Sequence, residues 1–216
     1  MKKLLFQLDT DAHPAVFDTV VAYDGGADHV IGHGNVTPDN VTSLVEGCIF
    51  TRAPKDKKYT AIFVGGSDMT AGEKLFKAVQ KTFFADFRVS VMLDSNGSNT
   101  TAAAGVAKLL TSGSIRDKRC VILAGTGPVG RRAAAMMALE GANVALTSRT
   151  ADRARQTCAD IKTTFDVDIE PIAAADNEAR ARAVEDANVV FATGAAGTEL
   201  LLPEHWQGND NIEMIA

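Results

Sequence analysis

Short apolar runs alternate along this chain with longer stretches in which apolar residues recur every three or four positions. The short runs predict β-strands, and the 3.6-residue periodicity predicts helices. Strands are predicted over residues 3–8, 29–32, 48–51, 60–64, 89–93, 119–124, 143–147, 168–173, 189–193 and 212–216. Helices are predicted over residues 14–23, 38–46, 70–84, 100–110, 129–140, 151–165 and 178–186. Alternation of this kind is typical of an α/β protein whose parallel sheets are covered on both faces.

The length of 216 residues leaves room for one large or two small domains, at about 150 residues per domain. Between residues 111 and 118 the apolar content falls, while glycine and charged residues become more frequent. Such a change is typical of a domain junction. We therefore predict an N-terminal α/β domain over residues 1–110 and a second domain over residues 111–216, separated by a cleft and connected by the alanine-rich helix 100–110.

Composition and charge exclude several classes of protein. The chain carries 22 basic and 27 acidic residues, a net charge of −5, and 46% of its residues are apolar. These values exclude a basic nucleic-acid binder and a disordered chain. No apolar run approaches the roughly 18 residues that span a bilayer, and Asp9 interrupts the N-terminus too early for a signal peptide. We expect a cytoplasmic protein with neither a nucleic acid nor a membrane as its partner.

The cysteines and histidines do not predict a reactive centre. Cys48, Cys120 and Cys158 are odd in number and far apart, and two of them lie within apolar runs, as buried structural cysteines do. His29 and His33 have the spacing of a helical metal pair, but a predicted strand and turn separate them. We expect no catalytic metal and no Cys–His nucleophile.

A glycine loop follows the apolar strand 119–124 and opens the helix 129–140. The loop consists of Gly125, Thr126, Gly127, Pro128, Val129 and Gly130. This GxGxxG pattern lies between a strand and a helix, and a second strand follows, so it meets the structural requirements of a dinucleotide-binding βαβ unit. A glycine-rich turn without a ligand is the alternative. We predict that the second domain is a Rossmann-type domain.

The residues after the second strand of this unit indicate which dinucleotide binds. An NAD site places Asp or Glu about 20 residues after the loop, to bind the ribose hydroxyls. Here Ser148 and Arg149 follow the predicted strand 143–147, without an acid, and Arg153 follows one helical turn later. A guanidinium suits the 2′-phosphate of NADP. We predict NADP as the cofactor; the alternative is that these arginines are solvated surface residues.

A third loop follows the apolar strand 189–193. Its small residues, Thr193, Gly194 and Ala195, would lie at the carboxyl edge of the sheet, where ligands bind in such folds. We predict that they line the ribose or nicotinamide end of the cofactor. A plain strand-to-helix turn is the alternative.

A polar cluster over residues 94–101 is the most distinctive feature of the first domain. Seven of its eight side chains can form hydrogen bonds, and the cluster follows a predicted strand. Asp94, Asn96 and Asn99 are our candidates for binding a polar heterocyclic substrate. Ordinary helix-cap chemistry explains the same residues equally well.

Several stretches from both halves carry a family resemblance. Residues 9–11, 23–29, 34–40, 61–66, 93–105 and 123–130 together resemble the NADP-dependent methylene-tetrahydromethanopterin/methylene-tetrahydrofolate dehydrogenases of one-carbon-metabolising bacteria. The resemblance covers nearly the whole chain. It implies a two-domain enzyme, with NADP on the C-terminal domain and the tetrahydromethanopterin or tetrahydrofolate carrier on the N-terminal one. We also expect a homo-oligomer.

The implied reaction agrees with the absence of a reactive centre. Hydride leaves a methylene carbon held between two nitrogens and gives a methenyl cation, so the enzyme needs orientation and electrostatic support more than a base. Asp94 is our first candidate for stabilising this cation, and Asn96 and Asn99 would position the substrate. Asp24 is the second candidate for the carboxylate.

Two departures from related families qualify the resemblance. Bifunctional folate dehydrogenase/cyclohydrolases have a catalytic lysine four residues after a tyrosine, whereas Tyr23 here is followed by Ala27, so we expect no cyclohydrolase activity. The chain also stops on the strand 212–216, and we expect it to be a C-terminally truncated fragment. Alternative functions are a shikimate-dehydrogenase-like oxidoreductase and a non-catalytic NADPH-binding module.

Overall fold

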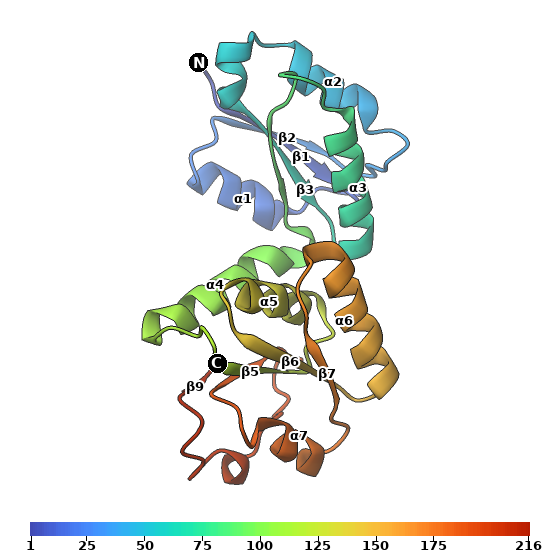
Figure 1. Ribbon diagram of the computed structural model, residues 1–216. Coiled ribbons are helices and arrows are strands. Elements are labelled where there is room, and N and C mark those ends of the chain that lie inside the picture. Colours follow the sequence, from blue (N-terminus) through green and yellow to red (C-terminus); the bar gives the residue numbers. More distant parts are fainter. The chain divides into compact units, whose positions relative to one another are not determined.

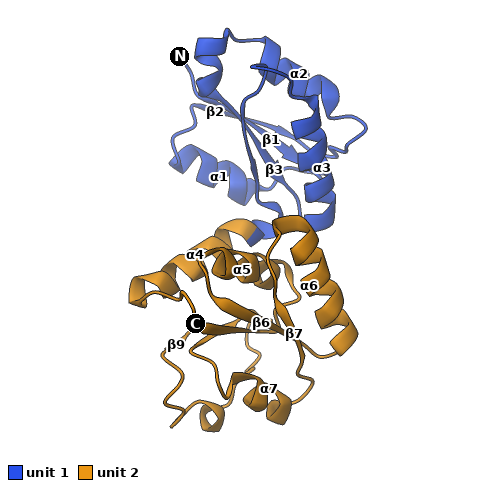
Figure 2. Ribbon diagram, viewed as in Figure 1, with its two compact units in different colours: residues 1–98 blue, residues 99–216 orange.

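The computed structural model describes residues 1–216, which form two compact units, Met1–Ser98 and Asn99–Ala216 (Figure 2). Each unit contains a parallel sheet with helices on its faces, so the predicted α/β class is confirmed. No helix of the chain combines the length and the apolar character needed to cross a membrane.

The first unit is a four-stranded sheet with the strand order β2-β1-β3-β4 (Figure 1). Its elements are β1 (Leu4–Asp9), α1 (Val16–Asp24), β2 (His29–His33), α2 (Thr42–Phe50), the 3₁₀ helix η1 (Pro54–Tyr59), β3 (Thr60–Gly65), α3 (Met69–Thr82), β4 (Ser90–Leu93) and the 3₁₀ turn η2 (Ser95–Gly97). All three strand pairs are parallel, with Asp9 opposite Gly65 at the carboxyl edge. Helix α1 covers one face of this sheet, and α2 and α3 cover the other.

The second unit is a five-stranded parallel sheet with the strand order β7-β6-β5-β8-β9. Its elements are α4 (Ser98–Ser112), whose first residue belongs to the first unit, β5 (Arg119–Leu123), α5 (Pro128–Leu139), β6 (Asn143–Ser148), α6 (Ala151–Phe165), β7 (Glu170–Ala173), α7 (Asn177–Val184), β8 (Val189–Ala192), the 3₁₀ turn η3 (Pro203–His205) and β9 (Met214–Ile215). Helices α4, α5 and α6 lie on one face of the sheet and α7 on the other (Figure 1).

Helix α2 corrects two sequence predictions. Residues 48–51 were expected to be a strand, but all except Thr51 belong to α2, which begins at Thr42 rather than at residue 38. Val41, Val45, Cys48 and Ile49 are fully buried against the sheet. Their spacing of three and four residues places them on one helical face, and this periodicity outweighs the β-propensity of the short apolar run.

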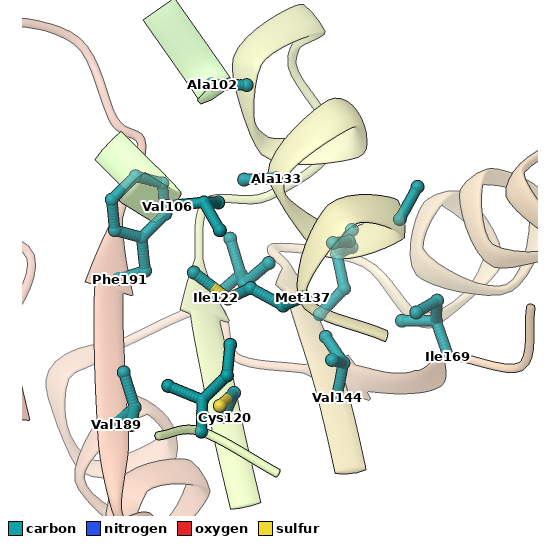
Figure 3. Packing of buried hydrophobic residues seen from close by; sticks show 14 of the residues in the cluster. Ala102, Val106, Cys120, Ile122, Ala133, Met137, Val144, Ile169, Val189 and Phe191 are labelled. Atoms are coloured by element: carbon teal, nitrogen blue, oxygen red, sulfur yellow. The ribbon is translucent and has the colours of Figure 1, made fainter. Parts of the chain in front are cut away.

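Helix α4 belongs to the second unit rather than connecting two domains. Its residues Ala102, Val106 and Leu109 are buried in the core of the second unit. Val106 lies beside Phe191 (Figure 3). A Cβ atom on Gly105 would lie 2.5 Å from Cζ of Phe191, so the helix approaches β8 closely. The boundary between compact units therefore lies at Ser98–Asn99 and not after residue 110, because this helix covers the second sheet.

The three cysteines are buried and unpaired. Burial raises the pKa of the Cys120 and Cys158 thiols to about 11. Burial also raises the pKa of the Cys48 thiol. Thiols in such surroundings stay protonated at neutral pH and are poor nucleophiles. The structural role predicted for these cysteines agrees with their positions.

Candidate active site

The glycine loop joins the carboxyl end of β5 to α5. A Cβ atom on Gly130 would lie 2.5 Å from the carbonyl oxygen of Gly125, so α5 can approach the loop only if residue 130 is glycine. Gly127 caps the helix with φ −77°, and Pro128 occupies the first turn, where its missing N–H is no loss. The first turn of α5 thus presents backbone N–H groups and a positive dipole.

Gly127 differs from the other two glycines of the motif. Beyond its own chain neighbours, no protein atom lies within 4 Å of the position that its Cβ would take, and its φ is one that any residue adopts. Neither packing nor backbone conformation therefore requires glycine here. A missing side chain at this position allows a ligand to approach the backbone, as a pyrophosphate does in dinucleotide sites.

The end of β6 is bonded to the start of the glycine loop. The backbone N–H of Ala124 donates to Oγ1 of Thr147 at 3.0 Å, and that of Gly125 donates to the carbonyl of Thr147 at 3.1 Å. Ala124 has φ +52°, an uncommon value for a residue with a side chain, and these bonds hold the turn in place. The loop is therefore fixed by its neighbouring strand.

The residues predicted to select NADP follow Thr147 directly. Ser148 ends β6 and is buried, whereas Arg149 and Arg153 are exposed. Neither arginine has a carboxylate partner in the structure, although Arg155 pairs with Asp152 at 2.5 Å. Two unpaired guanidinium groups beside the end of β6 are a suitable environment for a phosphate.

Thr193 ties the third loop to the glycine loop. Its N–H donates to the carbonyl of Leu123 at 3.0 Å, and its hydroxyl donates to the carbonyls of Leu123 and Ala124 at 3.0 and 3.3 Å. Gly194 and Ala195 follow and are exposed. The hydroxyl proton of Thr193 is thus used within the protein, so this residue positions the loop, and the exposed residues after it remain the candidates for touching a ligand.

These features test whether the second unit fits a dinucleotide. The helix N-terminus accepts negative charge, Gly127 leaves the backbone accessible, and the cationic groups follow the neighbouring strand. All of them lie at the carboxyl edge of one parallel sheet, where such folds bind ligands. The residues present fit a dinucleotide with an additional phosphate.

The first unit presents Asp94 and Asn96 after the carboxyl end of β4. Asp94 is buried, and its N–H donates to the carbonyl of Val64 at 3.0 Å. The N–H of Asn96 donates to Gly66 at 2.8 Å, and the hydroxyl of Ser95 to Gly65 at 3.1 Å. These bonds fix the loop to the end of β3. Asn96 has φ +56° and an exposed side chain, so it faces solvent from a rigid turn.

Two further carboxylates, which the sequence pattern does not single out, lie near Asp94. A Cβ atom on Gly65 would be 3.0 Å from Oδ2 of Asp9 and 3.5 Å from Oδ2 of Asp18, so both carboxylates approach the end of β3. Burial raises the pKa of Asp18, and the negative charges of Asp9 and Asp94 raise it further. The signal for Asp9 was present in the sequence, since it ends an apolar strand as Asp94 follows one.

Asp9 is fully buried and organises the start of α1. Its carboxylate accepts from the N–H groups of Asp11 at 2.9 Å and Ala15 at 3.2 Å. Helix α1 has no buried residue, and Gln7 of β1 bonds to Ala15 and Thr19. Polar contacts therefore attach this helix to the sheet, and Asp9 has a structural task at the start of α1.

Asn99 and Asp24 do not belong to the loop that carries Asp94 and Asn96. Asn99 belongs to the second unit, where its Oδ1 accepts from Nε of Arg132 at 2.6 Å. Asp24 is exposed at the end of α1, which leads from the carboxyl edge of β1 to the amino edge of β2. The structure therefore gathers Asp94 and Asn96 in one loop, and it favours Asp94 over Asp24 as the carboxylate of the site.

Comparison with known sequences gives related proteins from one organism. Residues 16–96 match the family described as methylene-tetrahydromethanopterin dehydrogenase, N-terminal. The chain is 57% identical over 217 residues to the bifunctional protein MdtA of Methylorubrum extorquens, covering all of this chain and 75% of that protein. It is 33% identical over 210 residues to the NAD(P)-dependent methylenetetrahydromethanopterin dehydrogenase of the same organism, covering 94% of this chain and 71% of that protein.

Comparison with solved structures supports the fold. Shikimate 5-dehydrogenase from Listeria monocytogenes, solved with shikimate and NAD, matches with a TM-score of 0.52 and 13% identity, over 96% of this chain and 76% of that one. The 5-ketofructose reductase of Gluconobacter sp. strain CHM43 matches with a TM-score of 0.51 and 16% identity, over 91% and 70%. At these identities the likeness concerns the fold alone, which agrees with the predicted Rossmann-type architecture.

Proposed function

The chain belongs to the methylene-tetrahydromethanopterin dehydrogenase family, and on this premise we propose that it oxidises methylene-tetrahydromethanopterin, methylene-tetrahydrofolate or both to the methenyl form with NADP. The observation that carries the proposal is the glycine loop of the second unit. Packing does not require glycine at position 127, yet the absence of a side chain there leaves the backbone accessible to a ligand. Bound NADP would accept the hydride that leaves the methylene carbon.

The second unit would bind the dinucleotide through residues from three loops. The N–H groups at the start of α5 would hold the pyrophosphate, and Ser148, Arg149 and Arg153 would hold the 2′-phosphate. Gly194 and Ala195 would border the ribose or nicotinamide end, on a loop that Thr193 fixes to the glycine loop. Because these loops are already bonded to one another, little ordering would be needed on binding.

The first unit would bind the C1 carrier and stabilise its product. When hydride leaves, positive charge spreads over the carbon and its two nitrogens, and a fixed carboxylate stabilises such a cation. Asp94 would supply this charge from a buried position at the end of β4. Asn96 would position the carrier from its exposed turn. Asn99, the other candidate for positioning it, belongs to the second unit, where its oxygen accepts from Arg132. No general base is required, because the leaving group is the hydride itself.

A spectroscopic assay tests this function. The protein would be mixed with NADP and either methylene-tetrahydromethanopterin or methylene-tetrahydrofolate, and the absorbance of the methenyl product would be followed. Product formation with one or both carriers supports the proposal and identifies the preferred one. If the protein binds NADP but forms no methenyl product from either carrier, the dehydrogenase function is contradicted and a non-catalytic NADPH-binding role is favoured.

A further inference from the structure

A pocket lies at the opposite edge of the first sheet from Asp94. It has a volume of about 310 Å³ and is lined by Lys57, Lys58, Arg88, Val89 and Ser90. The two lysines belong to η1, which runs into the amino end of β3, and Ser90 begins β4. Since Ala61 pairs with Ser90, the amino ends of these two parallel strands lie side by side. The pocket is therefore formed within the first unit alone.

Lys57 is a buried cation without an anionic partner. The residue is only 6% exposed, and its Nζ donates to the carbonyl of Asp86 at 3.0 Å. Nζ also lies 3.9 Å from the centre of the Phe87 ring. An ammonium has three donors, and burying it without an opposite charge is unfavourable. The environment of Lys57 is therefore incomplete in a way that an anion in the adjoining pocket would correct.

The remaining lining of the pocket has the same electrostatic character. Arg88 has no hydrogen-bond or ion-pair partner in the structure, and Lys58 lies over the Tyr59 ring at 5.2 Å without an acidic partner. No carboxylate lines the pocket. The acids closest in sequence are Asp56 and Asp86, and neither belongs to the lining. Three cations thus converge on one pocket of a chain whose net charge is −5.

We propose that this pocket binds a small molecule through a phosphate group held by Lys57, Lys58 and Arg88. Three cations suit a dianion, and the planar guanidinium of Arg88 matches two oxygens of one phosphate. The hydroxyl of Ser90 is a further donor, and Val89 forms an apolar wall. A volume of about 310 Å³ lies at the lower end of the range for small-molecule sites, about 300–1,000 Å³, so the ligand is small.

Nuclear magnetic resonance of the full chain tests this site with inorganic phosphate as the probe. The amide resonances of Lys58, Arg88 and Ser90 are expected to shift and to saturate as phosphate is added. Sodium chloride at matched ionic strength is the reference, because general screening of charge would produce equal shifts with chloride. Equal shifts with both salts, or no shift at these residues, would overturn the proposal.

Variants establish which side chains hold the phosphate. Arg88→Gln should weaken binding at least about tenfold, the effect of losing about 1.4 kcal/mol of a charge-assisted interaction. Lys57→Met should also weaken it, while Lys81→Gln, at an exposed position near the end of α3, should not. Arg88 is exposed, so its variant is expected to fold even if the buried Lys57 variant does not. Unchanged affinity in Arg88→Gln would contradict the site.

The glycine loop is the other place where phosphate could bind, and NADP separates the two. With NADP added to saturation, the phosphate-dependent shifts of Arg88 and Ser90 are expected to remain. If NADP abolishes them, the shifts report on the dinucleotide site and the proposal is overturned. The proposed dehydrogenase activity is not needed for this test, so the two proposals can fail independently.

Discussion

The carboxyl edges of the two parallel sheets differ in charge, although both sheets are built from alternating strands and helices. In the first unit, buried Asp9 ends β1, buried Asp94 follows β4, and Asp18 lies close to both. In the second unit, the corresponding edge has glycines, a helix N-terminus and the unpaired Arg149. One edge suits a cation and the other an anion. The comparison shows that the loop residues, and not the shared architecture, determine what each sheet can bind.

The largest effect is expected for Gly130, because no residue with a Cβ fits at this position of the glycine loop. In Gly130→Ala the new Cβ would lie 2.5 Å from backbone of Gly125, so the loop or the helix must shift. We expect a loss of about 1–3 kcal/mol in the free energy of unfolding, as for overpacked cores, and loss of NADP binding. Urea denaturation and calorimetric titration with NADP would measure the two effects.

Gly127→Ala is the matched control for this change. Its Cβ meets no protein atom, so the free energy of unfolding should stay within about 0.5 kcal/mol of the parent while NADP affinity falls. If both variants lose stability equally, the claim that packing requires Gly130 but not Gly127 is contradicted. If Gly127→Ala binds NADP normally, the pyrophosphate does not approach this position.

The next effect concerns the acidic edge and tests whether Asp94 supports a cation. Asp94→Asn keeps the size of the side chain and removes its charge, and we expect kcat to fall by about 10²-fold with NADP affinity unchanged. Steady-state kinetics with the preferred carrier would measure this. Asp24→Asn, at the exposed end of α1, is the control and should keep the parent rate. An unchanged kcat in Asp94→Asn would remove this residue from the chemistry.

A smaller effect is expected for Arg149, whose substitution distinguishes NADP from NAD as the preferred dinucleotide. Arg149→Ala should lower the affinity for NADP by about 10–100-fold, corresponding to about 1.5–3 kcal/mol for a hydrogen bond to a charged group, and should leave NAD affinity nearly unchanged. Fluorescence titration with both nucleotides would provide the ratio. Equal losses for the two nucleotides would show that Arg149 does not bind the 2′-phosphate.

The smallest effect concerns Asp18, whose raised pKa reflects burial and the neighbouring carboxylates. The folded protein holds this proton more tightly than the unfolded chain does, so the stabilisation is present below the unfolded pKa and is lost as the pH rises through the folded pKa. Asp18→Asn should therefore raise the free energy of unfolding at pH 7, and its advantage should shrink as the pH falls toward about 4. Urea denaturation at both pH values measures this, with Asp24→Asn as the control. If the stability gained by Asp18→Asn increases as the pH falls, the raised pKa of Asp18 is contradicted.

Much of the second unit could be predicted because its signals are local. Helix α6 has the predicted bounds, and the turn from β5 through the glycines to α5 follows from residues adjacent in sequence. Glycine widens the range of backbone conformations and proline narrows it wherever they occur, so neither signal depends on distant packing. The position of Arg149 at the end of β6 follows from the same local order.

The features that escaped prediction depend on contacts between distant residues. The helical face of α2 is defined by burial against a sheet whose strands lie elsewhere in the chain. The proximity of Asp18 to Asp9 depends on how closely α1 approaches Gly65, and the engagement of Asn99 depends on Arg132. Sequence patterns give the type of a residue and the element expected for it, but pairs of this kind are determined by tertiary packing.

Helix α4 has a consequence for exchanging parts between related proteins. Because Gly105 packs directly against Phe191, the helix and β8 must be compatible in shape. A chimaera joined after residue 110 would combine the helix of one parent with the sheet of another, whereas a junction between Ser98 and Asn99 transfers both together. Recombination at that peptide bond keeps each hydrophobic core from a single parent, which makes it the natural place to exchange dinucleotide specificity within the family.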